Sequence, residues 1–347
     1  MATLAPSNFT YAEWAARMDP DGKASVMVDL LSQQNGIIED CLAVECQSGN
    51  AFEFTQVVKL PTPTRRSYNV GVPATMAGVA KQVQTCIQYA DWSKIDTSLA
   101  RLGGNLAELR YREDALHLEA MGQQVASDLF YANRATDPTQ FTGLANIYNT
   151  VTTSTSLIAN NVIDGGGTGS TNTSMWLVTW GPDKIHTIFP KGMPAGMIHK
   201  DYGEYAPAVD SSSNEYPVYR TWFEWNIGLA VHDWRYAARL CNIDVTLFGG
   251  GSACNLIQGL AALCLKLPTT PAGVMPVQTD DSPFKNMMGR SVIYMNRTAY
   301  LALDLQAQNK TNVLLKMEEW MGHAILTYRG IPIRIVDALT NSESRVV

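Results

Sequence analysis

Residues 105–133 read NLAELRYREDALHLEAMGQQVASDLFYAN, a stretch with no proline and a single glycine, Gly122. Its apolar residues recur at three-, four- and seven-residue steps in two adjoining rows. One row is Leu106, Leu109, Leu116 and Ala120, and the other is Leu118, Met121, Val125 and Leu129. Two rows give an apolar stripe wider than a coiled-coil seam, which is typical of a helix that lies against a sheet.

The ends and the polar face of this segment support the same prediction. Asn105 is a candidate N-cap, and Glu108 follows three residues later, as in a capping box. The pairs Glu108/Arg112 and Arg110/Asp114 place opposite charges four residues apart, which favours a solvated outer face. At 1.5 Å per residue the helix is roughly 40 Å long, so it crosses most of a domain or reaches beyond it.

Residues 51–90, before the helix, predict a long hairpin. AFEFTQVVKLP (51–61) begins with the alternation of a strand, and VAKQVQTCIQY (79–89) is strand-like. The connection between them contains Pro61, Pro63, Arg65, Arg66 and Pro73. An arm of about fifteen residues reaches some 50 Å at ~3.3 Å per residue, against a radius of about 20 Å for a compact domain of this size. An isolated hairpin is marginal in water, so this one should lie on a neighbouring subunit.

Residues 1–50 are predicted to form an arm. Two short helical patterns, at Tyr11–Arg17 and Ser25–Leu31, are separated by the turn signal Asp19-Pro20-Asp21-Gly22. Neither helix can bury an apolar face by itself, so the arm is expected to lie on something larger.

The rest of the chain mixes strands and helices. Strands are predicted at 175–181, in the aromatic stretch 221–240, at 291–295 and at 323–339, where two strands flank Tyr328-Arg329-Gly330. Helices are predicted at 254–267 and 296–310, a short one opens at Pro182–Lys184, and residues 150–174 and 190–220 are predicted loops. Without a regular βαβ alternation, the fold class is α+β.

Composition excludes several functional classes. The chain has 347 residues, a formal net charge of −6, 46% hydrophobic and 17% charged residues, and no cluster of Lys and Arg that would mark a nucleic-acid-binding surface. No apolar run approaches the ~20 residues that span a bilayer, and the N-terminus does not resemble a secretory signal. The six cysteines form no C-x-x-C pair and are expected to be reduced.

The search for catalytic motifs gives no coherent set. GGGTGS (165–170) lacks the pattern of a dinucleotide or phosphate loop, and Ser252 fails the nucleophile-elbow pattern because Cys254 takes the last position. The five histidines are spread out, with no metal-ligand spacing, and His232 in its aromatic strand is expected to be structural. We therefore expect no enzymatic activity, no cofactor and no metal.

The ordered set of segments resembles a known family. RRSYNVGVP (65–73), the helix region 96–134, FTGLANIYN (141–149), WNIGLAVHDWRYAARLCNID (225–244) and HAILTYRGIPIRIVDAL (323–339) are similar to segments of major capsid proteins of tailed bacteriophages with the Hong Kong 97 fold. The similarity is greatest to coat proteins of short-tailed phages.

This resemblance implies an α+β Hong Kong 97-like capsid fold in four parts. Residues 1–50 would form an N-terminal arm and 51–90 an extended β-hairpin loop. Residues 91–144 and 311–347 would form a peripheral domain with a long spine helix, and 145–310 an axial domain. The inter-subunit contacts are expected at Lys59, Arg65, Arg66 and Lys81 of the hairpin and at Glu108, Arg110 and Arg112 of the helix.

The resemblance also implies a function and partners. The chain would assemble with itself into pentamers and hexamers of an icosahedral shell, in the host cytoplasm, and enclose double-stranded DNA in the virion. A separate scaffolding protein, a portal protein and a cement or decoration protein would be partners, and no membrane is involved. The alternative is a soluble α+β enzyme or carbohydrate-binding protein that uses the aromatic region 216–236.

Overall fold

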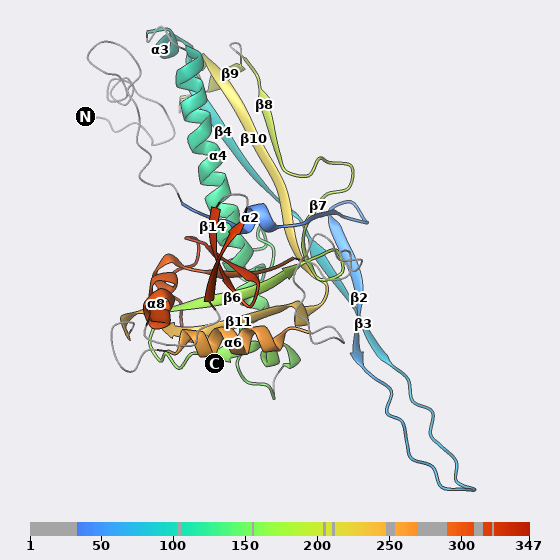
Figure 1. The fold of residues 1–347 in the computed structure, drawn as a ribbon. Coiled ribbons are helices and arrows are strands. Elements are labelled where there is room, and N and C mark those ends of the chain that lie inside the picture. Colours follow the sequence, from blue (N-terminus) through green and yellow to red (C-terminus); the bar gives the residue numbers. More distant parts are fainter. Residues whose placement is uncertain are drawn as a thin grey trace. The chain divides into compact units, whose positions relative to one another are not determined.

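The structure is a computed structural model, shown in Figure 1. It describes residues 33–102, 106–154, 156–203, 206–209, 212–247, 254–268, 290–308, 315–320 and 323–347. The predicted helices Tyr11–Arg17 and Ser25–Leu31, and the predicted N-cap Asn105, lie outside these residues. The described chain divides into two compact units. Unit 1 consists mainly of Gln88–Ala126 and Pro194–Ile227, and unit 2 of Asn35–Ile87, Ser127–Met193 and Gly228–Val347.

Unit 1 consists of a long helix and an antiparallel sheet. Its strands are β4 (Ile87–Asp96), β8 (Met197–Asp201), β9 (Ala206–Val209) and β10 (Glu215–Val231), and its helices are α3 (Thr97–Leu102) and α4 (Leu106–Tyr131). Strand β10 pairs with each of the other three. The last turn of α4 and the last residues of β10 belong to unit 2.

The long helix predicted from the sequence is confirmed. α4 has 26 residues, which at 1.5 Å per residue makes it about 39 Å long. Leu109 on α4 packs with Ile95, Ala100 and Tyr219 to form a small core. Met121 and Val125 of the same helix are also buried.

The predicted apolar stripe of α4 is wrong in the middle of the helix. Leu116 and Leu118 are 40% and 37% exposed, and Ala120 is exposed too. The face that meets the strands carries polar groups there instead. Arg110 forms an ion pair with Asp201 at 2.5 Å.

Two further polar contacts line the same face. Asp114 accepts a hydrogen bond from the Thr221 hydroxyl at 3.2 Å, and the ring of His117 lies 2.5 Å from the Asp91 carboxylate. The expected solvated pairing of Arg110 with Asp114 is therefore replaced by contacts to the sheet, because its strands supply matching polar groups.

Unit 2 is built around β6 (Asn172–Trp180), a strand in which every residue is buried. β11 (Ala237–Asp244) and β12 (Arg290–Met295) pair with it antiparallel, and β7 (Ile185–Phe189) pairs parallel at its end. The sheet continues from β12 through β15 (Ile331–Ile335) and β14 (His323–Tyr328) to β13 (Leu315–Trp320). β5 (Val162–Asp164) extends it beside β11, and β1 (Ala43–Glu45) and the end of β10 extend it beside β7.

Helices cover this sheet and complete the main core. α6 (Leu256–Lys266) and α8 (Arg297–Gln308) bury Leu260, Leu263 and Leu303 against apolar side chains of β6, β11 and β12. Shorter helices are α2 (Ile37–Asp40), α5 (Leu144–Ile147), η1 (Leu157–Asn161), η2 (Trp234–Tyr236) and η3 (Val245–Leu247). No helix in the described ranges has the length and apolar character needed to cross a membrane.

Three local predictions are wrong. Residues 150–174 are predicted as loop but contain η1, β5 and the first residues of β6. Pro182–Lys184 form a turn instead of a helix, because β6 and β7 pair at Trp180 and Ile185 and leave only a short connection between them. Residues 190–220 are predicted as loop but contain β8, β9 and the start of β10. Their side chains are mostly polar or exposed, so their sequence lacks the apolar alternation of a half-buried strand.

Other predictions are confirmed. Residues 165–170 are a loop, and strands β14 and β15 flank a tight turn. In that turn Arg329 and Gly330 have φ angles of 53° and 77°. A two-residue hairpin turn with positive φ at both positions matches the twist of its strands.

The chain enters unit 2 through α2. Ile37 is fully buried, and the buried Asp40 carboxylate pairs with Arg290 at 2.7 Å and Arg334 at 3.2 Å, and accepts a hydrogen bond from Tyr294 at 2.9 Å. Burial raises the pKa of Asp40 even though both arginines oppose that shift. Residues 35–45 are thus packed into unit 2. The four-part domain division stays a prediction.

Candidate assembly interface

The hairpin β2–β3 extends away from the rest of unit 2 (Figure 1). β2 (Ala51–Lys59) and β3 (Gly78–Thr85) pair antiparallel from Ala51/Thr85 to Lys59/Gly78, with a register shift near Val57. These strands form a sheet of their own, separate from the large one. The structure thus confirms the hairpin predicted from the alternation of Phe52 and Phe54.

The connection 60–77 exposes large apolar side chains. Tyr68 is 97% exposed, Met76 85% and Leu60 75%. Val57, Val58 and Val79 are exposed on the adjoining strands. An exposed apolar surface of this extent marks an interaction site.

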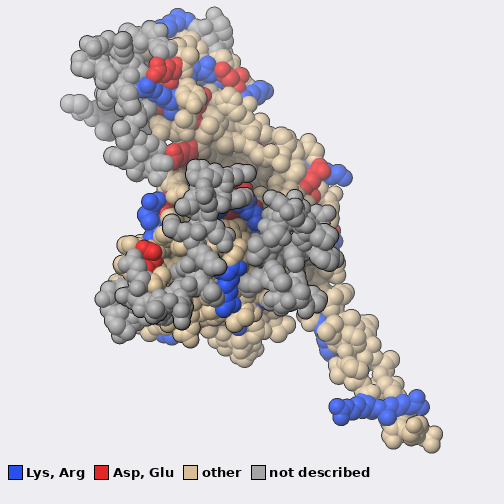
Figure 2. All heavy atoms as spheres, viewed as in Figure 1, with Lys and Arg blue, Asp and Glu red and all other residues tan. Residues whose placement is uncertain are grey.

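The same connection is basic. From Phe54 to Cys86 the sequence holds Lys59, Arg65, Arg66 and Lys81 but no Asp or Glu. Figure 2 shows Lys and Arg side chains near the end of the hairpin. Lys59, Arg65 and Arg66 are exposed, with the Arg66 Nε donating to the Val70 carbonyl at 2.8 Å. Lys81 forms an ion pair with Glu53 at 2.5 Å. The surface therefore suits a partner with apolar and acidic groups.

The hairpin is anchored at its base by a cluster of buried residues, which we call the root. It consists of Cys46, Phe52, Phe54, Cys86, Ile188 and Ala230. Both rings are 7% exposed and pack with Cys46, Cys86, Ile188 and Ala230. The Gln56 side-chain amide donates to the His232 carbonyl at 2.8 Å. The first residues of β2 are thus buried and anchor the strand, whereas its last residues are exposed and extend away from the rest of unit 2.

Two imidazoles complete the root. The His186 ring lies edge-on to Phe52, with centroids 4.9 Å apart, and the His232 ring lies 4.9 Å from Phe54. Burial is the main reason that the pKa of His186 falls to about 4, although the Gly181 backbone opposes the shift. Sequence reasoning treated His232 as structural, and its packing on Phe54 is consistent with that; it gave no role to His186.

Close backbone approach at the root requires a glycine. A Cβ on Gly228 would lie 2.8 Å from the Thr85 carbonyl oxygen and 3.1 Å from the Cys86 Cα. Gly228 therefore lets the end of β3 pack directly on β10, which ties the hairpin to the large sheet.

The predicted contact residues of α4 are placed differently. Glu108 and Arg112 form an ion pair within the helix, four residues apart. Arg110 is turned to the sheet of unit 1, where it bonds Asp201 and lies 5.2 Å from the Tyr219 ring. Glu108, Arg110 and Arg112 belong to unit 1, whereas the basic residues of the hairpin tip belong to unit 2. No contact within either unit therefore brings the two sets together. Their inter-subunit role stays a prediction, as does that of the hairpin residues.

Sequence reasoning missed the exposed apolar residues on both elements. Tyr111, Leu116 and Leu118 are exposed on α4, and Tyr68 and Met76 on the hairpin. For the hairpin, the absence of any alternating pattern between Leu60 and Ala77 was the available signal. For α4, the helical period could not reveal which side meets the sheet.

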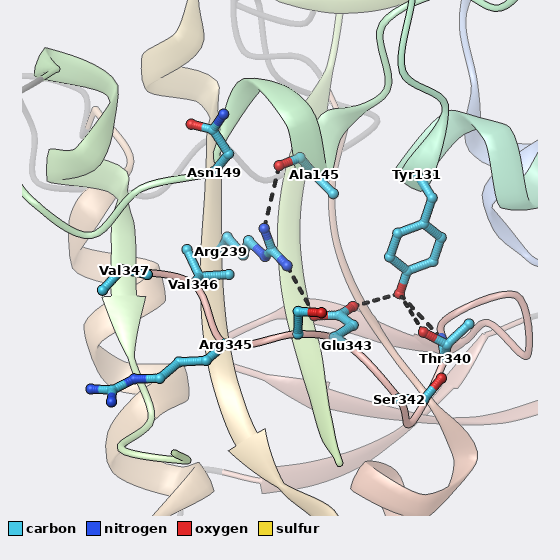
Figure 3. Close-up of a pocket in the computed structure, with 11 residues that line it drawn as sticks. Tyr131, Ala145, Asn149, Arg239, Thr340, Ser342, Glu343, Arg345, Val346 and Val347 are labelled. Atoms are coloured by element: carbon cyan, nitrogen blue, oxygen red, sulfur yellow. Dashed lines mark hydrogen bonds and ion pairs between the residues drawn. The ribbon is translucent and has the colours of Figure 1, made fainter. Parts of the chain in front are cut away.

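A second candidate site is a hollow that lies where the C-terminal residues cross unit 2 (Figure 3). It is a hollow of about 420 Å³ lined by Tyr131, Asn149, Arg239, Thr340 and residues 342–347, among others. Glu343 is one of its lining residues, and its carboxylate pairs with Arg239 at 2.9 Å and accepts a hydrogen bond from Tyr131 at 2.5 Å. Ser174 also donates to Glu343.

This arrangement anchors the C-terminus. The Arg239 guanidinium also donates to the Tyr148 carbonyl at 2.9 Å, and the backbone of Val346 is bonded to Asn242. Burial is the main cause that raises the pKa of Tyr131, with the Glu343 charge adding to it. The polar groups here satisfy one another, which is the pattern of a structural clasp. Among the described residues, no group of His, Cys, Asp and Glu has the geometry of a metal site.

Comparison with known proteins identifies the family. A family model for the major capsid protein GP7 matches residues 19–347. The chain belongs to this major capsid protein family. No curated protein sequence matches it.

A solved phage structure agrees with this assignment. The chain is 29% identical to a chain of bacteriophage Epsilon15, with a TM-score of 0.77, over 100% of this chain and 99% of that one. The bacteriophage JBD30 capsid is 9% identical with a TM-score of 0.48, over 95% and 99%. The holo-SrpI encapsulin of Synechococcus elongatus is 11% identical with a TM-score of 0.43, over 65% and 92%. These last two chains are much less similar to this one than the Epsilon15 chain is.

The resemblance found in the sequence is therefore confirmed. The fold is α+β and Hong Kong 97-like, and the chain is a structural capsid subunit that forms part of an icosahedral shell. This role replaces the alternative of a soluble enzyme or a carbohydrate-binding protein.

Proposed function

We propose that this capsid subunit forms the pentamers and hexamers of a shell around double-stranded phage DNA, and that the hairpin β2–β3 links neighbouring copies. The observation that carries the proposal is the exposure of the hairpin. A connection in which Tyr68 is 97% exposed and Met76 85% exposed has no reason to be apolar in a free monomer. Heterologous contacts repeated around rotation axes close into rings.

Charge supports the choice of a second copy as the partner. The chain carries a net charge of −6, whereas the hairpin from Phe54 to Cys86 is basic throughout. Arg65 and Arg66 would meet carboxylates of the neighbouring subunit, because the planar guanidinium suits carboxylates at interfaces. An acidic subunit also confines DNA without binding it tightly or reading its sequence.

The finer assignments rest on the family. We infer an N-terminal arm at 1–50, the extended loop at 51–90, a peripheral domain at 91–144 and 311–347, and an axial domain at 145–310. A separate scaffolding protein, a portal protein and a cement protein would act with the subunit, which would assemble in the host cytoplasm. We expect no enzymatic activity from this subunit.

Shortening the hairpin tests the proposal. Replacing Pro61–Pro73 with a short Gly-Ser link leaves the root residues Phe52 and Phe54 in place, so the subunit should stay soluble and folded by circular dichroism. Negative-stain microscopy and sedimentation should show the closed shells of the wild-type protein but none from the shortened protein.

The outcomes are distinct. Normal shells from the shortened protein would show that the hairpin is not an assembly element. Unfolding of the shortened protein would place the connection in the core of the subunit. A matched control replaces the exposed Lys191 with Ser and keeps Gly192, whose φ of 78° requires glycine, and it should leave the shells unchanged.

A further inference from the structure

Two thiols meet at the root of the hairpin. The Sγ atoms of Cys46 and Cys86 lie 3.4 Å apart, and the two residues are only 2% and 3% exposed. Phe52, Phe54, Ile188 and Ala230 surround them. Both cysteines belong to unit 2, so their separation is set within one compact body.

The backbone places them there. Cys46 follows β1 and is fixed by its N–H, which donates to the Phe189 carbonyl at 2.9 Å. Ser48 and Ala51 then reverse the chain into β2. Cys86 follows β3, where its N–H donates to the Asn50 carbonyl at 3.0 Å and its own carbonyl accepts from the Asn50 side chain at 2.9 Å.

We propose that Cys46 and Cys86 are a redox pair that closes into a disulfide when the subunit meets an oxidising medium. A disulfide needs an S–S distance of about 2.05 Å, which requires only a small approach of the two sulfurs from their present contact. The bond would join the two ends of the hairpin and enclose the whole of β2, the connection 60–77 and β3 in one covalent loop.

Other cysteines have different partners. Cys41 donates its thiol to the Ile37 carbonyl at 3.0 Å, and Cys241 donates to the Ile163 carbonyl at 3.3 Å. Cys264 is a buried residue of α6 and packs in the main core. These contacts satisfy the sulfur with backbone or apolar groups, whereas Cys46 and Cys86 are satisfied by each other.

The chemistry balances with a disulfide of low molecular weight, such as oxidised glutathione, as the oxidant. The thiolate of one cysteine attacks it, which forms a mixed disulfide and releases one glutathione. The second thiolate attacks the protein sulfur of the mixed disulfide, forms the Cys46–Cys86 bond and releases the second glutathione. Two protein thiols lose their protons and two electrons pass to glutathione.

Burial makes the pair slow to react in the folded subunit. It is the largest cause that raises the pKa of both thiols, so little thiolate is present at neutral pH. A reducing compartment keeps the pair as thiols, and an oxidising one favours the bond. The bond would then hold Phe52 and Phe54 in their packed positions and fix the root of the hairpin relative to the rest of unit 2.

The test uses the full-length unassembled subunit. It is refolded from denaturant in a buffer of oxidised and reduced glutathione, alkylated with N-ethylmaleimide and digested without reduction. Mass spectrometry should find Cys46 and Cys86 in one linked pair of peptides, with two of the six thiols lost. The Tm should rise on the order of 5 °C over the reduced protein, and dithiothreitol should reverse the rise.

Variants make the result specific. Cys46→Ala should keep all five remaining thiols free, whereas Cys264→Ala should still lose two. Six free thiols after refolding in this buffer, or a linkage between other cysteines, would overturn the proposal. The peptide map of the wild-type protein decides between these outcomes whether or not either variant folds. Shell formation is not measured, so the proposed assembly function stands or falls separately.

Discussion

Glu343 lies 104 residues from Arg239 in the sequence, yet the two side chains form a buried ion pair that is 4% and 6% exposed. Removing one partner of a buried pair leaves an uncompensated charge, which costs about 3–5 kcal/mol. Glu343→Gln keeps the shape of the side chain but removes its charge and replaces one acceptor oxygen with an NH2 donor. We expect the free energy of unfolding to fall by about 3 kcal/mol, as measured by urea denaturation of the unassembled subunit.

An exposed ion pair provides the control for that measurement. Arg297 and Asp337 pair at 2.9 Å, but the arginine is 63% exposed. Asp337→Asn should leave the denaturation midpoint unchanged within error, because exposed pairs contribute little. If Glu343→Gln behaves like Asp337→Asn, the C-terminal clasp does not stabilise unit 2.

His186 gives stability a pH dependence with a definite sign. Its folded pKa of about 4 lies below the ordinary value of 6.5, because the ring is buried beside Phe52 with His232 adding a like charge. Asp183 opposes this shift only in part. Above pH 6.5 the ring is neutral in the folded and unfolded chains and contributes nothing. As pH falls from 6.5 through 4, the unfolded chain binds a proton that the folded one resists, so stability is lost.

The contribution of His186 to this loss of folding stability can be isolated by substitution. The folded and unfolded pKa values imply a destabilisation on the order of 3 kcal/mol below pH 4. His186→Gln removes the titration, so the difference between wild type and variant in urea midpoint should change across pH 6.5 to 4 and be constant above it. A constant difference throughout would show that His186 is not buried as a neutral ring.

The sequence predicted few of the contacts that individual side chains make. Glu343 and Arg239 carry no local signal, because their pairing depends on where the last residues of the chain lie on β6 and β11. The polar face of α4 was equally hidden. A helical period places Leu116 and Leu118 together, but only the strands opposite decide that Arg110, Asp114 and His117 are the residues that face inward.

Elements were predicted more reliably than the contacts between them. α4, the hairpin, β6, α6 and the turn at Arg329-Gly330 each carry a strong local pattern, and each is present. The exceptions have physical reasons. β8 is a mostly exposed strand and β9 is the four-residue segment APAV, which is too short to show an alternating pattern. The pairing of both with β10 is a long-range property, and Pro182 opens a turn because the strands on either side are already paired.

Leu118 allows the continuity of α4 to be tested with little disturbance of a core. The side chain is 37% exposed, so substitution removes little packing. Leu118→Pro removes a backbone hydrogen bond and clashes with the preceding turn, which costs about 3 kcal/mol or more. We expect insoluble protein from Leu118→Pro.

The matched variant at that position is Leu118→Ala, which keeps the helix. It should be soluble and within about 0.5 kcal/mol of wild type. Folded, soluble Leu118→Pro with unchanged helical content by circular dichroism would show that α4 is not needed as a continuous helix.

For the whole molecule, the distribution of charge matters more than its total. The chain is acidic overall, but the hairpin beyond Glu53 carries only basic charges until Cys86. If the hairpin binds an acidic surface of a second copy, reversing Arg65 and Arg66 should prevent closed shells without unfolding the subunit. Electrostatic complementarity across an interface favours the correct partner, and like charges placed opposite each other disfavour it.

A control must separate the position of the charges from their number. Arg65→Glu with Arg66→Glu changes the formal net charge from −6 to −10, and so does Lys191→Glu with Lys266→Glu. Lys191 and Lys266 are exposed and lie outside the hairpin. Sedimentation and negative-stain microscopy should show shells from the lysine variant and only free subunits or capsomers from the arginine variant. Equal loss of shells in both would mean that general repulsion limits assembly, and equal retention would mean that the two arginines face solvent in the shell.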